Sequence, residues 1–124
     1  MMAKDSILFV EDELLLLKAY ELYFEEKYNV IMANDAESAF SKIQDDPSIC
    51  CLITDLKMPG LSGLELIKKA KLISSDIYCF LVSGYLMDDT IRELIDNDIL
   101  EQIFTKPVDM ETLLSAIENV LAKK

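Results

Sequence analysis

The stretch that decides the fold is residues 49–60, which read ICCLITDLKMPG. Its first six residues are apolar or β-branched, and such a run bounded by a turn signal is typical of a strand buried on both faces. Asp55 ends the run, and Met58-Pro59-Gly60 then turns the chain away. Because a lone buried carboxylate costs several kcal/mol unless a cation or hydrogen-bond donors meet it, the rest of the chain must supply partners for Asp55.

Composition limits the classes of protein to which the chain can belong. With 124 residues, 52% of them hydrophobic and 28% charged, we expect a single globular domain over residues 1–124. The net charge of −11 disfavours direct binding to nucleic acid or to an anionic membrane, since both need a cationic face. The absence of histidine excludes mechanisms that need an imidazole base or a histidine metal ligand.

Cysteine usage and the N-terminus predict a cytoplasmic location. The three cysteines, Cys50, Cys51 and Cys79, are odd in number, lie in apolar runs and form no CxxC pair. We therefore expect reduced core thiols and no structural zinc. The N-terminus lacks the basic and apolar regions of a signal peptide, and no apolar run approaches the ~20 residues of a membrane span.

Strand and helix patterns alternate five times along the chain. The expected strands are residues 6–10, 29–33, 49–55, 77–82 and 102–105. A helix should follow each, the first ending near residue 26 and the fourth covering about residues 88–97. This alternation predicts an α/β fold, with a doubly wound five-stranded parallel sheet and helices on both faces.

Capping patterns and apolar spacing predict how the helices begin and which residues they bury. Asn34 with Glu37 and Ser62 with Glu65 have the spacing of capping boxes, and Asp109 should cap the last helix. In the first helix, the residues expected to face the core are Leu16, Ala19, Tyr20 and Tyr23, which leaves Leu15 and Leu22 exposed.

Polar residues stand at the ends of four of the predicted strands. They are Glu11 and Asp12, Asp55, Ser83 and Lys106. In a parallel α/β sheet the binding crevice lies at the carboxyl ends of the strands, so these side chains should converge. Three carboxylates together need a cation, and an all-oxygen cluster suits Mg²⁺. With a lysine and a hydroxyl beside them, they describe a phosphoryl-transfer site.

Four fragments carry a resemblance to a known family. Val10-Glu11-Asp12-Glu13, residues 55–60, Ser83-Gly84 and Thr105-Lys106-Pro107 resemble, in order and spacing, the signature of bacterial two-component response-regulator receiver domains, the CheY-like family. The resemblance covers essentially the whole chain. It implies a flavodoxin-like three-layer sandwich with strand order 2-1-3-4-5.

The resemblance also implies a role for each residue at the strand ends. Asp55 would accept a phosphoryl group from a phosphohistidine. Mg²⁺ would be held by Asp55, by the acids at positions 11 and 12, and by the backbone carbonyl of Lys57. Ser83 would hydrogen-bond the phosphoryl oxygen and Lys106 would pair with it. The Lys106–Pro107 peptide bond would be cis.

These roles describe a signalling switch of a phosphorelay rather than an enzyme, with at most slow Mg²⁺-dependent self-phosphorylation and self-dephosphorylation. The implied partners are a sensor histidine kinase or phosphotransfer protein and a downstream protein or fused output domain; homodimer formation is left open. On phosphorylation, the loop after the fourth strand would shift and the face formed by the fourth helix, fifth strand and fifth helix would change its partners.

Three alternative functions compete with a phosphorelay switch. A nucleotide or flavin binder needs a phosphate-cradling loop after the first strand, where this chain has three acids. A magnesium phosphohydrolase would need a second acid two residues after Asp55, where Lys57 stands. A degenerate receiver that serves only as a docking module is the remaining alternative.

Two positions depart from the family pattern. The family usually has an aromatic residue three positions before the lysine, whereas here that residue is Ile103 and the aromatic Phe104 follows it. Since side chains alternate along a strand, Phe104 should point to the opposite face. The turn before the last strand, usually Gly-Ala-like, is residues 97–100, Asn-Asp-Ile-Leu, and should have a different shape.

Overall fold

The computed structural model describes residues 4–84 and 88–123. Within these ranges five strands and five helices alternate. The strands are β1 (Ser6–Val10), β2 (Asn29–Ala33), β3 (Ile49–Asp55), β4 (Tyr78–Ser83) and β5 (Gln102–Thr105). The helices are α1 (Leu14–Phe24), α2 (Ala36–Asp45), α3 (Gly63–Ile73), α4 (Asp89–Asp96) and α5 (Met110–Leu121).

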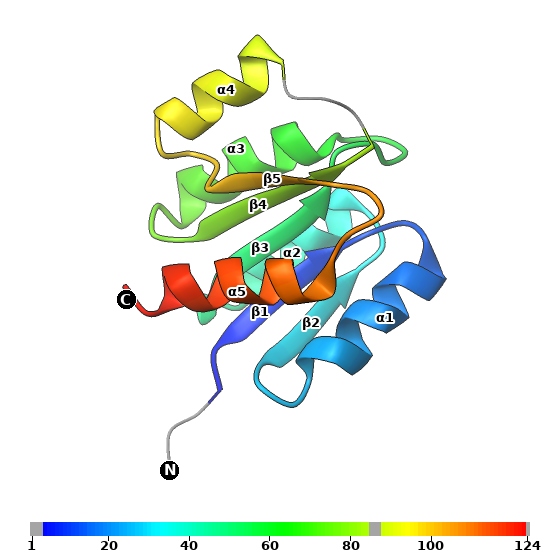
Figure 1. The fold of residues 1–124 in the computed structure, drawn as a ribbon. Coiled ribbons are helices and arrows are strands. Elements are labelled where there is room, and N and C mark those ends of the chain that lie inside the picture. Colours follow the sequence, from blue (N-terminus) through cyan, green and yellow to red (C-terminus); the bar gives the residue numbers. More distant parts are fainter. Residues whose placement is uncertain (1–3, 85–87, 124) are drawn as a thin grey trace.

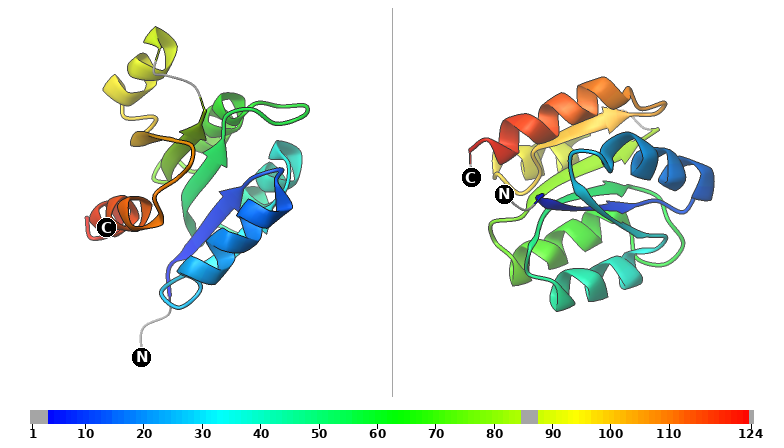
Figure 2. Two further views of the ribbon diagram at one scale, coloured as in Figure 1. Left: turned by 45° about the vertical axis from the view of Figure 1, so that its right-hand side comes forward. Right: turned by 90° about the horizontal axis from the view of Figure 1, so that it is seen from below.

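The strands form one parallel sheet in the order β2-β1-β3-β4-β5 (Figure 1), which confirms the predicted fold class. The view from below in Figure 2 shows α1 and α5 on one side of the sheet and α2 and α3 on the other. The order reverses between β1 and β3, so their carboxyl ends open a crevice. In the described residues, no helix combines the length and apolar content needed to cross a bilayer.

Two apolar cores lie on the two sides of the sheet, and they differ in composition. The core beneath α2, α3 and α4 is built from aliphatic residues and small ones such as Ala36, Ala39 and Ala70. The core beneath α1 and α5, called here the aromatic core, contains the rings Phe9, Tyr20, Phe24, Tyr28, Phe80 and Phe104. Phe9 stacks on Tyr20 with ring centroids 4.4 Å apart. The sheet is therefore buried on both faces, as residues 49–54 predicted.

The first helix packs in a different phase from the one predicted. Its buried residues are Leu17, Tyr20 and Phe24, whereas Tyr23, expected to face the core, is 41% exposed. Four consecutive leucines at positions 14–17 fit several helical phases equally well, so the apolar period alone cannot choose among them. The predicted exposure of Leu15 and Leu22 is confirmed.

Helix caps are mostly where the sequence places them. Ser62 and Glu65 form the predicted capping box, and the Asp109 side chain accepts hydrogen bonds from the first turn of α5. The prediction for α2 was wrong, because the cap is Asp35, which accepts from the Ser38 backbone N–H, and not Asn34 with Glu37. Both residues are good caps, and here the extended backbone falls at Asp35.

The last strand confirms the predicted orientation of Phe104. Phe104 is buried in the aromatic core with its ring centroid 6.0 Å from that of Phe80, while Ile103 packs against the opposite core. In the turn, Asp98 has a left-handed backbone with φ 59° and ends α4. The amides of Ile99 and Leu100 both donate to the Leu94 carbonyl.

Candidate functional site

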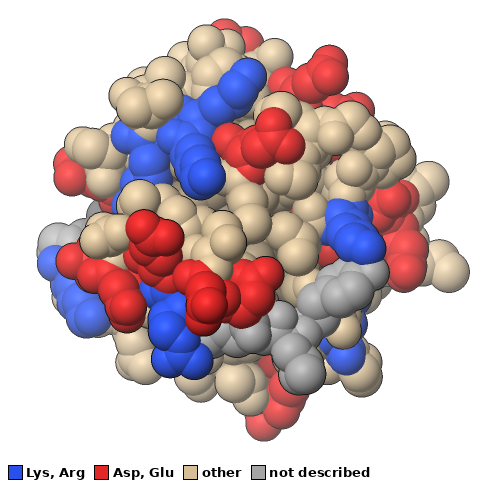
Figure 3. All heavy atoms as spheres, turned by 90° about the horizontal axis from the view of Figure 1, so that it is seen from above, with Lys and Arg blue, Asp and Glu red and all other residues tan. Residues whose placement is uncertain are grey.

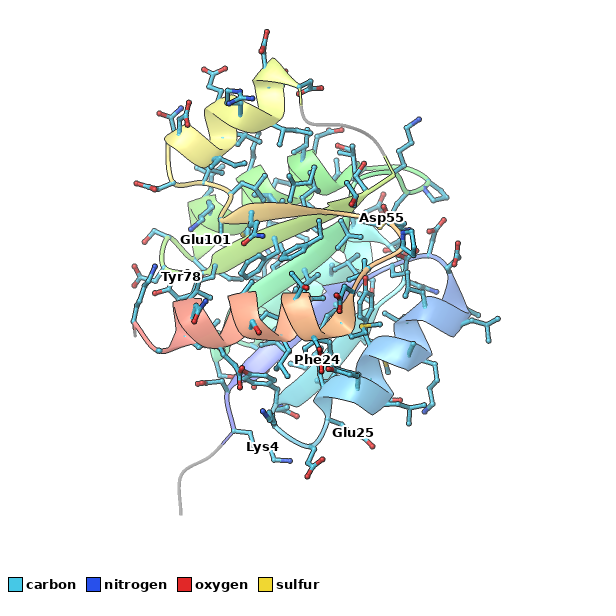
Figure 4. The ribbon with its side chains drawn as sticks, in the orientation of Figure 1. Lys4, Phe24, Glu25, Asp55, Tyr78 and Glu101 are labelled. Atoms are coloured by element: carbon cyan, nitrogen blue, oxygen red, sulfur yellow. The ribbon has the colours of Figure 1, made fainter. Side chains whose placement is uncertain are left out.

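Four strands deliver polar side chains to one end of the sheet. Asp55 and Ser83 are the last residues of β3 and β4, while Glu11 and Lys106 directly follow β1 and β5. Backbone hydrogen bonds between neighbouring strands continue past the strand ends. The amide of Lys106 donates to the Ser83 carbonyl at 2.9 Å, and that of Glu11 donates to the Ala33 carbonyl at 3.1 Å. Figure 4 shows Asp55 at this end of the sheet.

Three of these side chains lie on the side of the sheet that carries the aromatic core. Residues two apart in a strand point to the same face, and each charged residue stands two positions after a member of that core: Glu11 after Phe9, Asp55 after Ile53, and Lys106 after Phe104. The charged pocket is therefore a continuation of the aromatic core toward the carboxyl ends of the strands.

Lys106 joins the two buried carboxylates. Its Nζ lies 3.0 Å from Glu11 Oε1 and donates a hydrogen bond to Asp55 Oδ2 at 3.2 Å. Glu11 and Asp55 are 1% and 7% exposed, whereas Asp12 at the rim is exposed to solvent. The ammonium group thus supplies the cation that the position of Asp55 required.

The charges in the pocket alter each other's ionisation. Burial raises the pKa of Glu11, and this outweighs the hydrogen bond from the Glu13 amide and the contact with Lys106, which lower it. For Lys106, burial lowers the pKa, but contacts with Glu11 and Asp55 outweigh burial, so its pKa is raised. Burial, with the negative charges of Glu11 and Asp55, also raises the pKa of Tyr20 beneath the pocket. Lys106 therefore remains an ammonium group throughout the neutral range.

The acidic residues fit a divalent cation. One carboxylate oxygen from each of Glu11, Asp12 and Asp55 lies within 4.8 Å of the others. Glu11 Oε2 accepts a hydrogen bond from the Glu13 amide, whereas the buried Oε1 accepts none from the described residues and has only its ionic contact with Lys106. A cluster of carboxylate oxygens, one of them buried without a donor, is the ligand set that Mg²⁺ prefers.

The other two residues of the predicted site lie at its edge. Ser83 is 1% exposed at the end of β4, in register with Thr105 of the neighbouring strand. Lys57 is exposed two residues after Asp55. The loop predicted to shift after the fourth strand includes residues 85–87, which lie outside the described residues. The Lys106–Pro107 peptide bond is cis, as the resemblance implied.

One positioning residue, Gly63, was not predicted from the sequence. A Cβ atom at this first residue of α3 would lie 2.1 Å from the Asp55 carbonyl oxygen, so the helix can begin against the end of β3 only with glycine there. The Gly63 amide donates to the Leu56 carbonyl at 2.9 Å. The sequence signal was a glycine directly after a cap serine, but a sequence cannot reveal which backbone it approaches.

Comparisons with known proteins agree on one family. The family model of the response regulator receiver domain matches residues 7–118. The chain is 27% identical to sporulation initiation phosphotransferase F of Bacillus subtilis, over 99% of this chain and 98% of that protein. It is 30% identical to response regulator RR06 of Streptococcus pneumoniae over 95% of the chain, but covers only 54% of that protein.

Other relatives are longer still, and solved structures share the fold. The chain is 32% identical over 73% of its length to the transcriptional regulatory protein YesN of B. subtilis, of which it covers 24%. A CheY-like receiver domain protein from Methanospirillum hungatei superposes with a TM-score of 0.89 at 26% identity, covering 98% of this chain and 96% of that one. A receiver domain protein from Clostridium thermocellum gives 0.87 at 25% identity, covering 98% and 96%.

Proposed function

The chain belongs to the response regulator receiver domain family of two-component signalling, and from this premise we propose that it is a phosphoryl-accepting switch with Asp55 as the acceptor. The observation that carries the proposal is the arrangement around Asp55. A nearly buried carboxylate ends the central strand, touches an ammonium group on one side and shares an acidic cluster on the other.

In the proposed reaction an Asp55 carboxylate oxygen attacks the phosphorus of a phosphohistidine. A P–O bond forms, the P–N bond breaks, and the imidazole leaves with the electron pair. Asp55 and the phosphoryl group are both anionic, so positioning and charge neutralisation must carry the reaction. Lys106 is already within 3.2 Å of Asp55 to meet the incoming charge. Bound Mg²⁺, held by Glu11, Asp12, Asp55 and the Lys57 carbonyl, would neutralise the phosphoryl oxygens.

Phosphorylation would then change the contacts of Lys106 and Ser83. The new phosphoryl oxygens compete with Glu11 for the ammonium group, and Ser83 on the adjacent strand supplies a hydroxyl donor. Because Phe104 is held in the aromatic core, we infer that movement after β4, rather than rotation of an aromatic side chain, carries the change to the α4–β5–α5 face.

The partners follow from the family. The phosphoryl donor would be a histidine kinase or a phosphotransfer protein, and the receiver of the signal a downstream protein or a fused output domain. The relatives include proteins of about the length of this chain and others of which it covers 54% or 24%. A degenerate receiver that only docks to partners is not favoured, because Glu11, Asp55 and Lys106 keep their mutual contacts.

The decisive experiment is labelling by a small phosphodonor such as acetyl phosphate. The parent chain should gain one phosphoryl group in the presence of Mg²⁺, measured by intact-protein mass spectrometry, and Asp55→Asn should gain none. Asp45→Asn, in the last turn of α2, is the matched control and should be labelled normally. Asp12→Ala should lose the Mg²⁺ dependence. Unchanged labelling of Asp55→Asn would refute the assignment.

A further inference from the structure

One buried hydroxyl group has no role in the proposed reaction. Charged side chains are spread over the outer surface of the molecule, and Figure 3 shows one such face. Among the described residues, the polar and charged side chains that are buried are Ser6, Glu11, Thr54, Asp55 and Ser83. Three of them belong to the site at the carboxyl ends of the strands, and Ser6 is the first residue of β1, at the opposite end of the sheet. Thr54 remains to be accounted for.

Thr54 lies among apolar neighbours, at a position where a valine would have the same shape. Side chains alternate along β3, so Thr54 points away from the charged pocket, into the core beneath α2, α3 and α4, as Leu52 does. Its partners in the neighbouring strands are Val10 and Leu81, both members of that core. Thr54 is 0% exposed, so its hydroxyl group is removed from water and needs a hydrogen-bond partner within the protein.

That partner is the backbone of the proposed phosphoryl acceptor. The Thr54 hydroxyl donates to the Asp55 carbonyl oxygen at 2.9 Å. The same oxygen lies against α3, because a Cβ atom at Gly63 would come within 2.1 Å of it. The next residue is fixed as well, since the Leu56 amide donates to the Val82 carbonyl at 3.0 Å and the Leu56 carbonyl accepts from the Gly63 amide at 2.9 Å. A hydroxyl group, a helix and a strand thus hold the main chain where β3 ends.

The orientation of this main chain sets the geometry of the pocket on the other face of the sheet. Asp55 Oδ2 lies 3.2 Å from Lys106 Nζ, and the Asp55 carboxylate also belongs to the acidic cluster. The carbonyl of Lys57, expected to bind Mg²⁺ together with Asp55, follows two residues later. Rotation of the peptide group after Asp55 would move both ligands, and a displacement of about 1 Å can cost on the order of 10²-fold in rate.

We propose that Thr54 is a positioning residue for phosphoryl transfer, whose hydroxyl group holds the Asp55 backbone from the face of the sheet opposite the pocket. Thr54 points away from the reacting atoms and acts through Asp55 alone. The inference rests on the proposed function of Asp55 as phosphoryl acceptor. A hydroxyl group with a purely structural role would contribute to the stability of the fold, but its loss would leave the Mg²⁺ affinity and the labelling rate of the folded protein unchanged.

Two pairs of proteins isolate the contribution of the hydroxyl group. Thr54→Val differs from the parent by the hydroxyl and keeps the shape of the side chain, whereas Thr54→Ser and Thr54→Ala differ from each other by the hydroxyl alone. Within each pair, its loss should slow labelling by acetyl phosphate about tenfold. It should also weaken binding of Mg²⁺ alone, measured by calorimetry without a phosphodonor. Thr54→Ser loses a buried methyl group and should unfold at a lower urea concentration than the parent, yet it should be labelled and bind Mg²⁺ nearly as well.

Ser6→Ala is the matched control, because it removes a buried hydroxyl group at the opposite end of the sheet, where Ser6 accepts a hydrogen bond from the Asn29 side chain. It should lower stability without changing the labelling rate or the Mg²⁺ affinity. Far-UV circular dichroism shows whether each variant is folded, and the serine and alanine variants decide the question if Thr54→Val does not fold.

The proposal is overturned if Thr54→Val is labelled as fast as the parent or binds Mg²⁺ as tightly. It is also overturned if Thr54→Ser and Thr54→Ala lose labelling and Mg²⁺ affinity to the same extent. Failure of the proposed function is a separate result, in which the parent itself is not labelled or Asp55→Asn is labelled normally. The Mg²⁺ titrations test the role of Thr54 in either case.

Discussion

The charged pocket and the aromatic core are built from the same strands, two residues apart. β1, β3 and β5 place Phe9, Ile53 and Phe104 in the core, and the side chains two positions later are Glu11, Asp55 and Lys106. Burial of the core residues stabilises the folded state by about 25 cal/mol per Å² of apolar surface. In the pocket, burial raises the pKa of Glu11, and its Oε1 accepts no hydrogen bond from the described residues and has only its ionic contact with Lys106.

The charged pocket is therefore held in place by the aromatic core rather than by its own contacts. Buried ion pairs often fail to recover the cost of removing charges from water. Functional sites commonly reduce stability, which the rest of the fold must supply. We therefore expect substitutions in the two regions to separate stability from phosphorylation, and the following predictions are ordered from the largest expected effect.

Phe80→Ala tests how much the aromatic core contributes to stability. Phe80 is 1% exposed and adjoins the Phe104 ring, so its truncation should lower the free energy of unfolding by about 3–5 kcal/mol. Urea unfolding followed by circular dichroism measures the loss, and the protein that remains folded should still be labelled by acetyl phosphate. Phe40→Ala, on the half-buried Phe40 of the other side, should cost clearly less. Equal losses of unfolding free energy would show that the aromatic core contributes no more to stability than the core on the other side of the sheet.

Gly63→Ala should affect both regions at once, because its side chain would push α3 against β3, the strand that ends at Asp55. Its Cβ would lie 2.1 Å from the Asp55 carbonyl oxygen. Relief of this overlap should cost about 1–3 kcal/mol and slow labelling about tenfold or more by displacing Asp55. Gly84→Ala, whose Cβ would meet no atom of the described residues within 4 Å, is the control for stability. A stable Gly63→Ala variant with normal labelling would contradict the role given to this glycine.

Glu11→Gln tests how the buried carboxylate of the pocket changes the pH dependence of stability. Because burial raises the pKa of Glu11 above its ordinary value of 4.5, its ionisation opposes folding, and its contribution to stability falls as pH rises from that value through the raised pKa. Without Mg²⁺, the variant should therefore gain stability relative to the parent as pH increases to 7, by less than Gly63→Ala loses. Urea titrations at several pH values measure this, with exposed Glu26→Gln as control. A constant difference between variant and parent would show that Glu11 does not titrate in this way.

Asp98 lies outside both the pocket and the aromatic core, and Asp98→Gly measures how much a strained backbone conformation alone changes stability. Asp98 has φ 59°, where glycine lacks the steric cost of a side chain, so the variant should be more stable by about 0.5–1 kcal/mol. Asn97 has φ −93°, and Asn97→Gly should show no gain. Thermal unfolding of the two variants side by side distinguishes them, and a loss of stability in Asp98→Gly would run against this account.

The sequence predicted the fold and the pocket well because both depend on strands. Apolar runs such as residues 49–54 have no competing interpretation once strand and helix alternate, and a parallel sheet then brings all carboxyl ends to one edge. The convergence of Glu11, Asp12, Asp55 and Lys106 follows from that topology alone. The period-two alternation likewise separated Phe104 from Ile103 correctly.

The errors fall where several local solutions have nearly equal energy. The leucine run at positions 14–17 fits more than one helical phase, and Asn34 and Asp35 are comparable caps. Gly63 was missed for a different reason, since its importance comes from the Asp55 backbone approaching in space. Periodicity predicts which face of an element is buried, but close approaches between backbones depend on how the elements are packed.

The stacked pair formed by Phe9 and Tyr20 has a practical consequence. The chain contains five tyrosines and no tryptophan, so its intrinsic fluorescence comes from tyrosine. Tyr20 stacks on Phe9 of β1, and its pKa is raised by burial and by the negative charges of Glu11 and Asp55. We therefore expect tyrosine emission to change when a cation binds in the pocket or when Asp55 is phosphorylated, so that both events could be followed without attaching a dye.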